Sequence, residues 1–125
     1  MTQEDKELLL RDLSARLPYG VICKCYHTEF DEWDGKPFVA IYNETLKNID
    51  VNGVFLVGSF SYEIDEVKPY LRPMSSMTEE ERKYLQKLPF PYDFVDWLTA
   101  HHFDYRGLIE KGLALEATSE TYNKK

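Results

Sequence analysis

The stretch Tyr62–Arg82, YEIDEVKPYLRPMSSMTEEER, decides the fold, because it joins a first half with the pattern of short strands to a second half with the pattern of helices. Two proline pairs within it, KP at 68–69 and RP at 72–73, fix two φ angles and disfavour helical backbone at the residue before each proline. This part therefore predicts stiff, extended chain. Thr78 and Glu81 then stand at capping-box spacing, which predicts a helix whose N-cap is Thr78.

The composition indicates a single folded domain over residues 1–125. That length is enough to bury a core without disulfides or metal ions, and 43% of the residues are hydrophobic. The formal net charge of −7 disfavours direct binding of DNA or RNA, because contacts with a phosphate backbone require clustered Lys and Arg. An acidic surface suits a basic protein partner, or a decoy that occupies a DNA-binding protein.

The chain shows no targeting or membrane signal. Residues 1–11 are rich in charge and lack the apolar core of a signal peptide, and no run of about 18 apolar residues occurs. We therefore expect a cytoplasmic protein without membrane contact, in which both cysteines are thiols.

The first half predicts a helix followed by strands. In residues 1–18, Thr2 and Asp5 stand at capping spacing, and leucines recur at helical intervals until Pro18. Residues 19–68 predict short antiparallel strands in two hairpins, whose turns are Asp34-Gly35 and Asn52-Gly53. The expected strands are Tyr19–His27 with Phe38–Tyr42, and Leu46–Val51 with Val54–Phe60.

The predicted sheet is small, antiparallel and strongly bent. Gly58 inside a strand indicates a bulge or bend, and Tyr62–Ile64 can add a further short strand. Four or five such strands would form either an SH3-like barrel or an open meander. The expected fold class is therefore α+β, with this sheet packed against the N-terminal helix and a helical C-terminal half.

Residues 78–112 predict helices. The first covers 79–88, the second begins at Pro91, and Asp104 can cap a third that ends at Gly112. Residues 113–116 can add an edge strand or a last turn, and residues 118–125 have the composition of a frayed tail.

The loop of residues 27–36 is acidic and aromatic. Its carboxylates are those of Glu29, Asp31, Glu32 and Asp34, and they surround Phe30 and Trp33. Their spacing does not match a calcium-binding loop. We interpret the loop as an exposed acidic turn, with an acidic-aromatic lip for a protein partner as the alternative.

Two groups of residues raise the question of a metal or catalytic site. Cys23, Cys25 and His27 alternate along a predicted strand, so they share a face and, with a further histidine, would suit Zn²⁺. However, C-x-C along a strand is a weak zinc signal, and cysteine is an ordinary core residue. We therefore expect no metal and no cofactor.

The segment HHFDYRG at 101–107 gathers an acid, two bases and a cation. His101, His102 and Asp104 would be the catalytic groups of a small hydrolase or metal-dependent enzyme. A structural role is the simpler interpretation, since a histidine favours a helix C-terminus and Asp104 caps the helix expected to follow.

VKPYLRPMSSMTEEE at 67–81 and HHFDYRGLIEKGLALEA at 101–117, with LPYGV at 17–21, resemble small uncharacterised proteins of gut Bacteroidetes and of their phages and integrated elements. The resemblance implies an accessory protein of a bacterial mobile element. It implies no activity, cofactor or catalytic residue.

The absence of catalytic motifs and the abundance of Tyr, Trp and Arg predict a non-enzymatic protein-binding module, because these residue types dominate interface energetics. The predicted anchors are Tyr62, Tyr70 and Tyr105, and the predicted oriented cations are Arg72 and Arg106.

Overall fold

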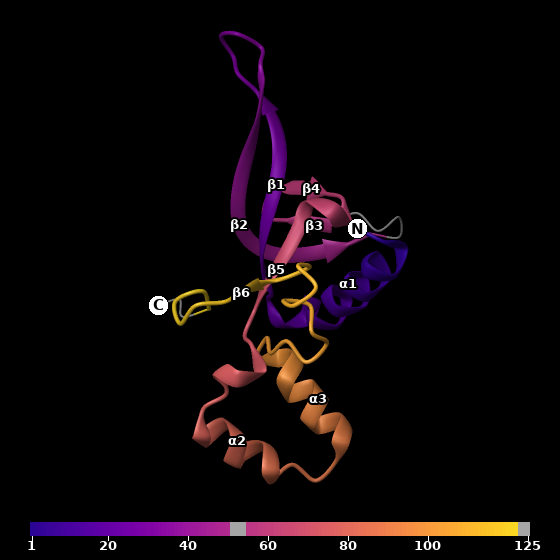
Figure 1. Cartoon of the computed structure of the whole chain (residues 1–125), viewed down its shortest axis with the longest axis vertical. Coiled ribbons are helices and arrows are strands. Elements are labelled where there is room, and N and C mark those ends of the chain that lie inside the picture. The colour runs from indigo at the N-terminus through magenta and orange to yellow at the C-terminus, as the bar shows by residue number, and fades with distance from the viewer. Residues whose placement is uncertain (51–54, 123–125) are drawn as a thin grey trace.

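The computed structural model describes residues 1–50 and 55–122, which form an α+β fold (Figure 1). A six-stranded sheet makes up one part of the molecule, and helix α1, Gln3–Arg16, packs against one face of it. A smaller lobe with helices α2, Glu79–Gln86, and α3, Pro91–Ala100, lies at the other end. The predicted α+β class and the N-terminal helix are confirmed.

Helix α1 begins with the capping box that the sequence indicates. The Thr2 hydroxyl accepts a hydrogen bond from the Asp5 amide at 3.0 Å, and the Asp5 carboxylate accepts one from the Thr2 amide. These bonds satisfy amides that a first helical turn leaves unpaired. Leu9 and Leu13 are fully buried against the sheet, so the helix covers the core through one apolar stripe.

The sheet is open and mixed. Its strand order is β4-β3-β2-β1-β5-β6, and each neighbouring pair is antiparallel except β5 with β6, which is parallel. The strands are β1 Ile22–Phe30, β2 Pro37–Ile49, β3 Phe55–Val57, β4 Phe60–Tyr62, β5 Val67–Leu71 and β6 Leu115–Glu116. Because β4 and β6 are edges, the SH3-like barrel is wrong, and the purely antiparallel sheet is wrong because β6 joins from the distant C-terminal segment.

β2 is one bent strand of 13 residues, where the sequence predicts two. Residues 43–45 contain no glycine or proline to stop it, so pairing with β1 continues to Thr45. The register then shifts between Leu46 and Asn48, where β3 becomes the partner. The second hairpin is confirmed by this antiparallel pairing, while its predicted turn at Asn52-Gly53 lies outside the described residues.

The joining stretch forms β5, which lies between β1 and β6. Its backbone is extended, as the prolines predict, and Val67, Pro69 and Leu71 are buried while the residues between them are partly exposed. The stretch that connects the two halves is therefore also a strand of the core sheet.

Two of the three predicted C-terminal helices form. Thr78 caps α2 with the predicted capping box, and the lobe has its own small core of Leu85, Leu98 and Phe103. The third helix, predicted up to Gly112, is wrong, because the chain makes successive turns there. Gly107, in its middle, has φ +73°, which a right-handed helix does not allow.

Tyr122 docks on the sheet, within residues 118–125 where the sequence predicts a frayed tail. The Tyr122 hydroxyl accepts a hydrogen bond from the Ile22 amide at 3.0 Å and donates one to the Tyr70 carbonyl at 2.6 Å. This hydroxyl bridges β1 and β5 one residue beyond the Cys23–Pro69 pair. Residues 123–125 lie outside the described part of the chain.

Gly58 makes the turn between β3 and β4 with φ +61°. A Cβ there would lie 2.9 Å from Cγ and 3.1 Å from Cβ of Glu44. We predict that Gly58→Ala lowers the free energy of unfolding by more than the roughly 1–2 kcal/mol expected for a left-handed alanine alone. Gly107→Ala is the control, since it has the same backbone requirement but nothing within 4 Å. Equal losses for both variants in urea unfolding would contradict the contact with Glu44.

Candidate functional site

The candidate site is a two-stranded arm, residues 26–41, that projects past the rest of the sheet (Figure 1). Pairing of β1 with β5 is confined to Cys23–Cys25, and pairing of β2 with β3 to Leu46–Ile49. Within residues 1–50 and 55–122, the arm is therefore paired only along its own ladder, from Tyr26 opposite Ile41 to Phe30 opposite Pro37. In that described part of the chain, no further strand pairs with either edge of the arm.

The tip of the arm is a turn held by its own carboxylates. The Asp31 carboxylate accepts hydrogen bonds from the amides of Trp33, at 2.7 Å, and Asp34, at 3.1 Å. The Asp34 carboxylate accepts one from the Lys36 amide at 2.8 Å. Two of the four predicted acidic residues thus fix the turn, which is a normal role for aspartate, and their charge still lies at the tip.

The arm exposes large apolar side chains on both faces. Because β1 alternates and Cys23 and Cys25 point into the core, Phe30, Val39 and Ile41 lie on the face away from α1. They are 66%, 62% and 52% exposed, and Trp33 at the tip is 96% exposed. Apolar side chains that cluster without burial mark interaction surfaces in soluble proteins.

Aromatic contacts hold the base of the arm on its other face. The Phe60 ring of β4 stacks on the rings of Tyr42, at 5.4 Å, and His27, at 5.5 Å. The Tyr42 hydroxyl donates a hydrogen bond to Glu29 at 2.7 Å, and this bond raises the pKa of Tyr42. The strands of the arm are thus fixed where they leave the sheet.

The geometry does not assemble the hypothetical zinc site. Cys23 and Cys25 are buried, and burial raises the pKa of Cys23 and raises that of Cys25 to about 12, which disfavours the thiolate that a metal needs. The His27 ring stacks on the ring of Phe60. Among the described residues, the three side chains close enough to share an ion are carboxylates of one acidic turn, the exposed Glu63 and Asp65 and the partly buried Glu66.

The hypothetical catalytic histidines face aromatic rings rather than an acid. His101 stacks on Trp97 at 4.1 Å, and His102 stacks on Tyr122 at 4.1 Å. Both oxygens of the Asp104 carboxylate accept backbone hydrogen bonds, from Leu108 at 2.8 Å and Ile109 at 3.0 Å. Asp104 therefore has a structural role, but it caps a turn where the structural interpretation predicts a helix, and the described contacts contain no acid-histidine pair.

His102 is an unusual residue. It has φ +61°, only 7% of it is exposed, and its Nδ1 has no hydrogen-bond partner among the described residues. Burial, together with the nearby Arg16 guanidinium, lowers its pKa to about 4. Its imidazole is therefore neutral at pH 7.

The predicted tyrosine anchors have structural contacts. Tyr62 lies in the core with 2% exposure, and the Tyr105 hydroxyl shares a hydrogen bond of 2.8 Å with Thr99. Tyr70 lies on the outer face of the sheet, where its hydroxyl donates to the Asn43 side chain at 2.7 Å. Of these three, Tyr70 is the one that lies on the same face of the sheet as Val39 and Ile41 of the arm.

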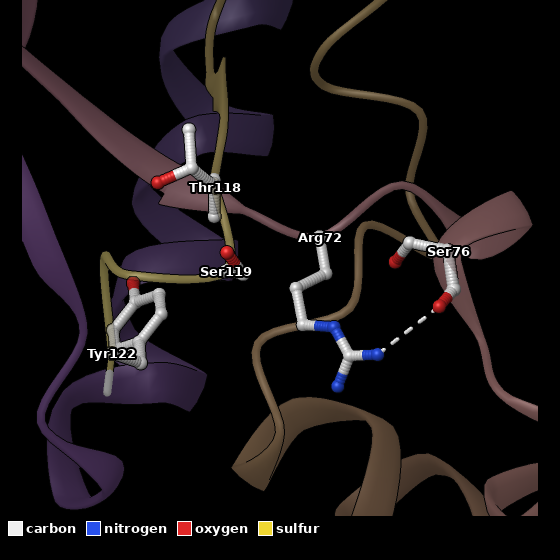
Figure 2. Close-up of a pocket in the computed structure, with 6 residues that line it drawn as sticks. Arg72, Ser76, Thr118, Ser119 and Tyr122 are labelled. Carbon is white, nitrogen blue, oxygen red and sulfur yellow. Dashed lines mark hydrogen bonds between the residues drawn. The ribbon is translucent and has the colours of Figure 1, made fainter.

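The Arg72 side chain binds residues of the lobe. Its guanidinium donates two hydrogen bonds to the Glu81 carboxylate, at 2.7 and 2.8 Å, and lies over the Phe103 ring at 4.1 Å. The paired arginine lowers the pKa of Glu81 to about 2. Arg72 also lines a cleft of about 450 Å³. Figure 2 shows its further hydrogen bond to the Ser76 carbonyl.

Arg106 belongs to a buried charge network that sequence reasoning missed. Asp12 and Arg16 on α1 are fully buried and form an ion pair of 2.8 Å, and Arg106 binds the other oxygen of Asp12 at 2.8 Å. Arg16 also donates to the carbonyls of Phe103 and Thr99. The sequence does indicate the burial of Asp12 and Arg16, since positions 12 and 16 lie on the same helical face as Leu9 and Leu13.

The lobe carries a second exposed apolar surface. It includes Phe90 stacked on Tyr92 at 5.4 Å, beside the half-exposed Val95. This surface lies on a helical lobe and presents side chains. The arm, in contrast, has free strand edges in the described part of the chain and can offer backbone groups as well as side chains.

No family model, curated protein or solved structure matches this chain. Among the described residues, the helices are too short or too polar to cross a membrane.

We predict that Asp12→Ala lowers the free energy of unfolding by about 3–5 kcal/mol, because Arg16 then keeps a buried charge without its partner. Glu81→Ala, which breaks a partly exposed pair and one hydrogen bond of the α2 capping box, is the control and should cost less, about 1–2 kcal/mol. Urea unfolding at pH 7 measures both. Similar losses would show that burial does not distinguish the two pairs.

We predict that acid destabilises the protein through His102. Its pKa is lowered from 6.5 to about 4 in the folded state, so the unfolded state binds more protons between these values, and stability falls as pH drops from 6.5 toward 4. His102→Asn should flatten this loss, since asparagine tolerates positive φ, whereas His27→Asn serves as the control. A pH profile that is identical for wild type and His102→Asn in denaturant unfolding would refute it.

Proposed function

We propose that the protein is a non-enzymatic protein-binding module whose interface is the arm. The observation that carries this proposal is Trp33, which is 96% exposed at the tip of the arm and adds almost nothing to the core. A large aromatic ring contributes most to binding when a partner buries it, and Trp is enriched among the residues that dominate interface energetics.

The charge of the arm indicates the kind of partner. Its residues include four carboxylates and one lysine, Lys36. A partner surface with an apolar pocket bordered by Lys or Arg would match both the rings and the charge. This proposal moves the interface away from Tyr62, Tyr105, Arg72 and Arg106, whose contacts are internal, and keeps Tyr70 at its margin.

The alternative functions have weaker support. The hydrolase would need His101, His102 and Asp104 to act together, yet Asp104 is bound by two amides and each histidine by a ring. An acidic decoy of a DNA-binding protein would use the same carboxylates, and would bind with a steep dependence on salt. A cytoplasmic accessory protein of a bacterial or phage mobile element is the cellular setting we propose, on the resemblance of residues 67–81 and 101–117.

The test is site-specific photo-crosslinking in bacterial cells. A benzophenone amino acid placed at position 33 should form one dominant adduct with another protein. The same group at Tyr84, which is 51% exposed on the lobe, should not form that adduct. Equal adducts from both positions, or none from position 33 while the protein remains folded, would exclude the arm as the interface.

A further inference from the structure

We propose that the free edge of β2 pairs with the same edge of a second copy of this chain, which joins two arms into one antiparallel four-stranded ribbon. This inference goes beyond the proposed function, because it concerns the contact of the protein with itself.

The backbone groups along this edge face outward in a defined pattern. The Leu46 amide donates to Val21, and the Asp31 amide donates to the Lys36 carbonyl, both at 2.9 Å. Antiparallel ladders alternate, so the even-numbered residues of β2 bond to β1 and the odd-numbered ones point away. The amides of Val39, Ile41 and Asn43 are therefore directed at the open edge.

The edge lacks the features that keep strand edges apart. The segment PFVAIYN, residues 37–43, contains no charge, and its one proline is the first residue of the strand. Natural edges are usually blocked by lysines, internal prolines or bulges. Here the register shift comes only after Leu46, outside the segment.

The segment is complementary to itself about Ala40. When this edge pairs with its own copy, residues whose backbone groups face outward must lie opposite each other. These residues are odd-numbered, so the numbers of two opposite residues add up to an even number, and the two-fold axis passes through a residue. With Ala40 on the two-fold axis, small side chains meet at the centre, the aliphatic and aromatic pairs match in kind, and the outermost pair has opposite charges. The pairs are Val39 with Ile41, Phe38 with Tyr42, Pro37 with Asn43, and Lys36 with Glu44 of the other copy.

The charges favour this register over its neighbours. Centred on Ala40, the uncharged segment is bounded at each end by a Lys36–Glu44 pair of opposite sign. Moving the axis to Val39 would place Asp34 opposite Glu44. Moving the axis to Ile41 would place Lys36 opposite Leu46 of the other copy, and Leu46 already pairs with Val57 of β3.

The pairing also satisfies the backbone. Val39 and Ile41 of the two copies would exchange both of their hydrogen bonds, and each Asn43 amide would reach a Pro37 carbonyl. Pro37 has no amide to leave unpaired. Phe30, Val39 and Ile41 of both copies would then form one continuous apolar face, with Trp33 still free at each tip.

The first experiment is sedimentation velocity of the full chain at concentrations up to about 100 µM. Wild type should sediment as a dimer. Val39→Lys with Ile41→Lys should sediment as a folded monomer, since both side chains are more than half exposed and lysines block strand edges. Val95→Lys, a change at a 43% exposed position on α3, is the control and should remain dimeric.

A charge exchange tests the register. Lys36→Glu and Glu44→Lys should each weaken dimerisation by roughly tenfold, and the double variant should restore it, because each dimer has two such pairs. In wild type, hydrogen exchange at the amides of Val39, Ile41 and Asn43 should slow as concentration rises.

The proposal is overturned if wild type is monomeric, if the arm lysines leave the dimer intact, or if Val95→Lys also dissociates it. Failure of the double exchange to rescue would overturn the register. None of these results affects the crosslink from position 33, so the two proposals can fail separately.

Discussion

The buried pair of Asp12 and Arg16 is the interaction on which the rest of the structure depends. Both side chains are fully buried, and together they bind Arg106 and the carbonyls of Thr99 and Phe103. One helix is thereby tied to the end of α3 and to the turns that follow it. Such a pair is costly to desolvate, and its value lies in directional contacts that fix one arrangement.

This network explains why the C-terminal segment could be predicted only in part. Local rules placed the capping boxes at Thr2 and Thr78, the leucine stripe of α1 and the first two C-terminal helices. They failed at residues 104–112, where distant partners of Arg106 and hydrogen bonds to Asp104 hold turns rather than a helix. The parallel β6 and the docked Tyr122 also depend on contacts far apart in sequence, which no local pattern reveals.

The candidate site shows the same division. Residue type alone selected Tyr62, Arg72, Tyr105 and Arg106 as interface residues, and these side chains serve the fold. The sequence did indicate an acidic-aromatic lip around Trp33, as the alternative to a plain acidic turn. Trp33 lies at the end of a projecting ribbon because β5 pairs with only the first part of β1 and β3 with only the last part of β2. The register of the whole sheet determines these limits.

α1, β5 and the turns after α3 contribute to the buried core and its charge network, while the arm carries exposed apolar side chains that the core does not use. The most direct measurement combines the melting temperature with partner capture for a variant in which Phe30, Trp33, Val39 and Ile41 are all replaced by threonine. Our account predicts an almost unchanged melting temperature and loss of the partner that crosslinks at position 33. A sharp fall in melting temperature, or capture equal to wild type, would contradict it.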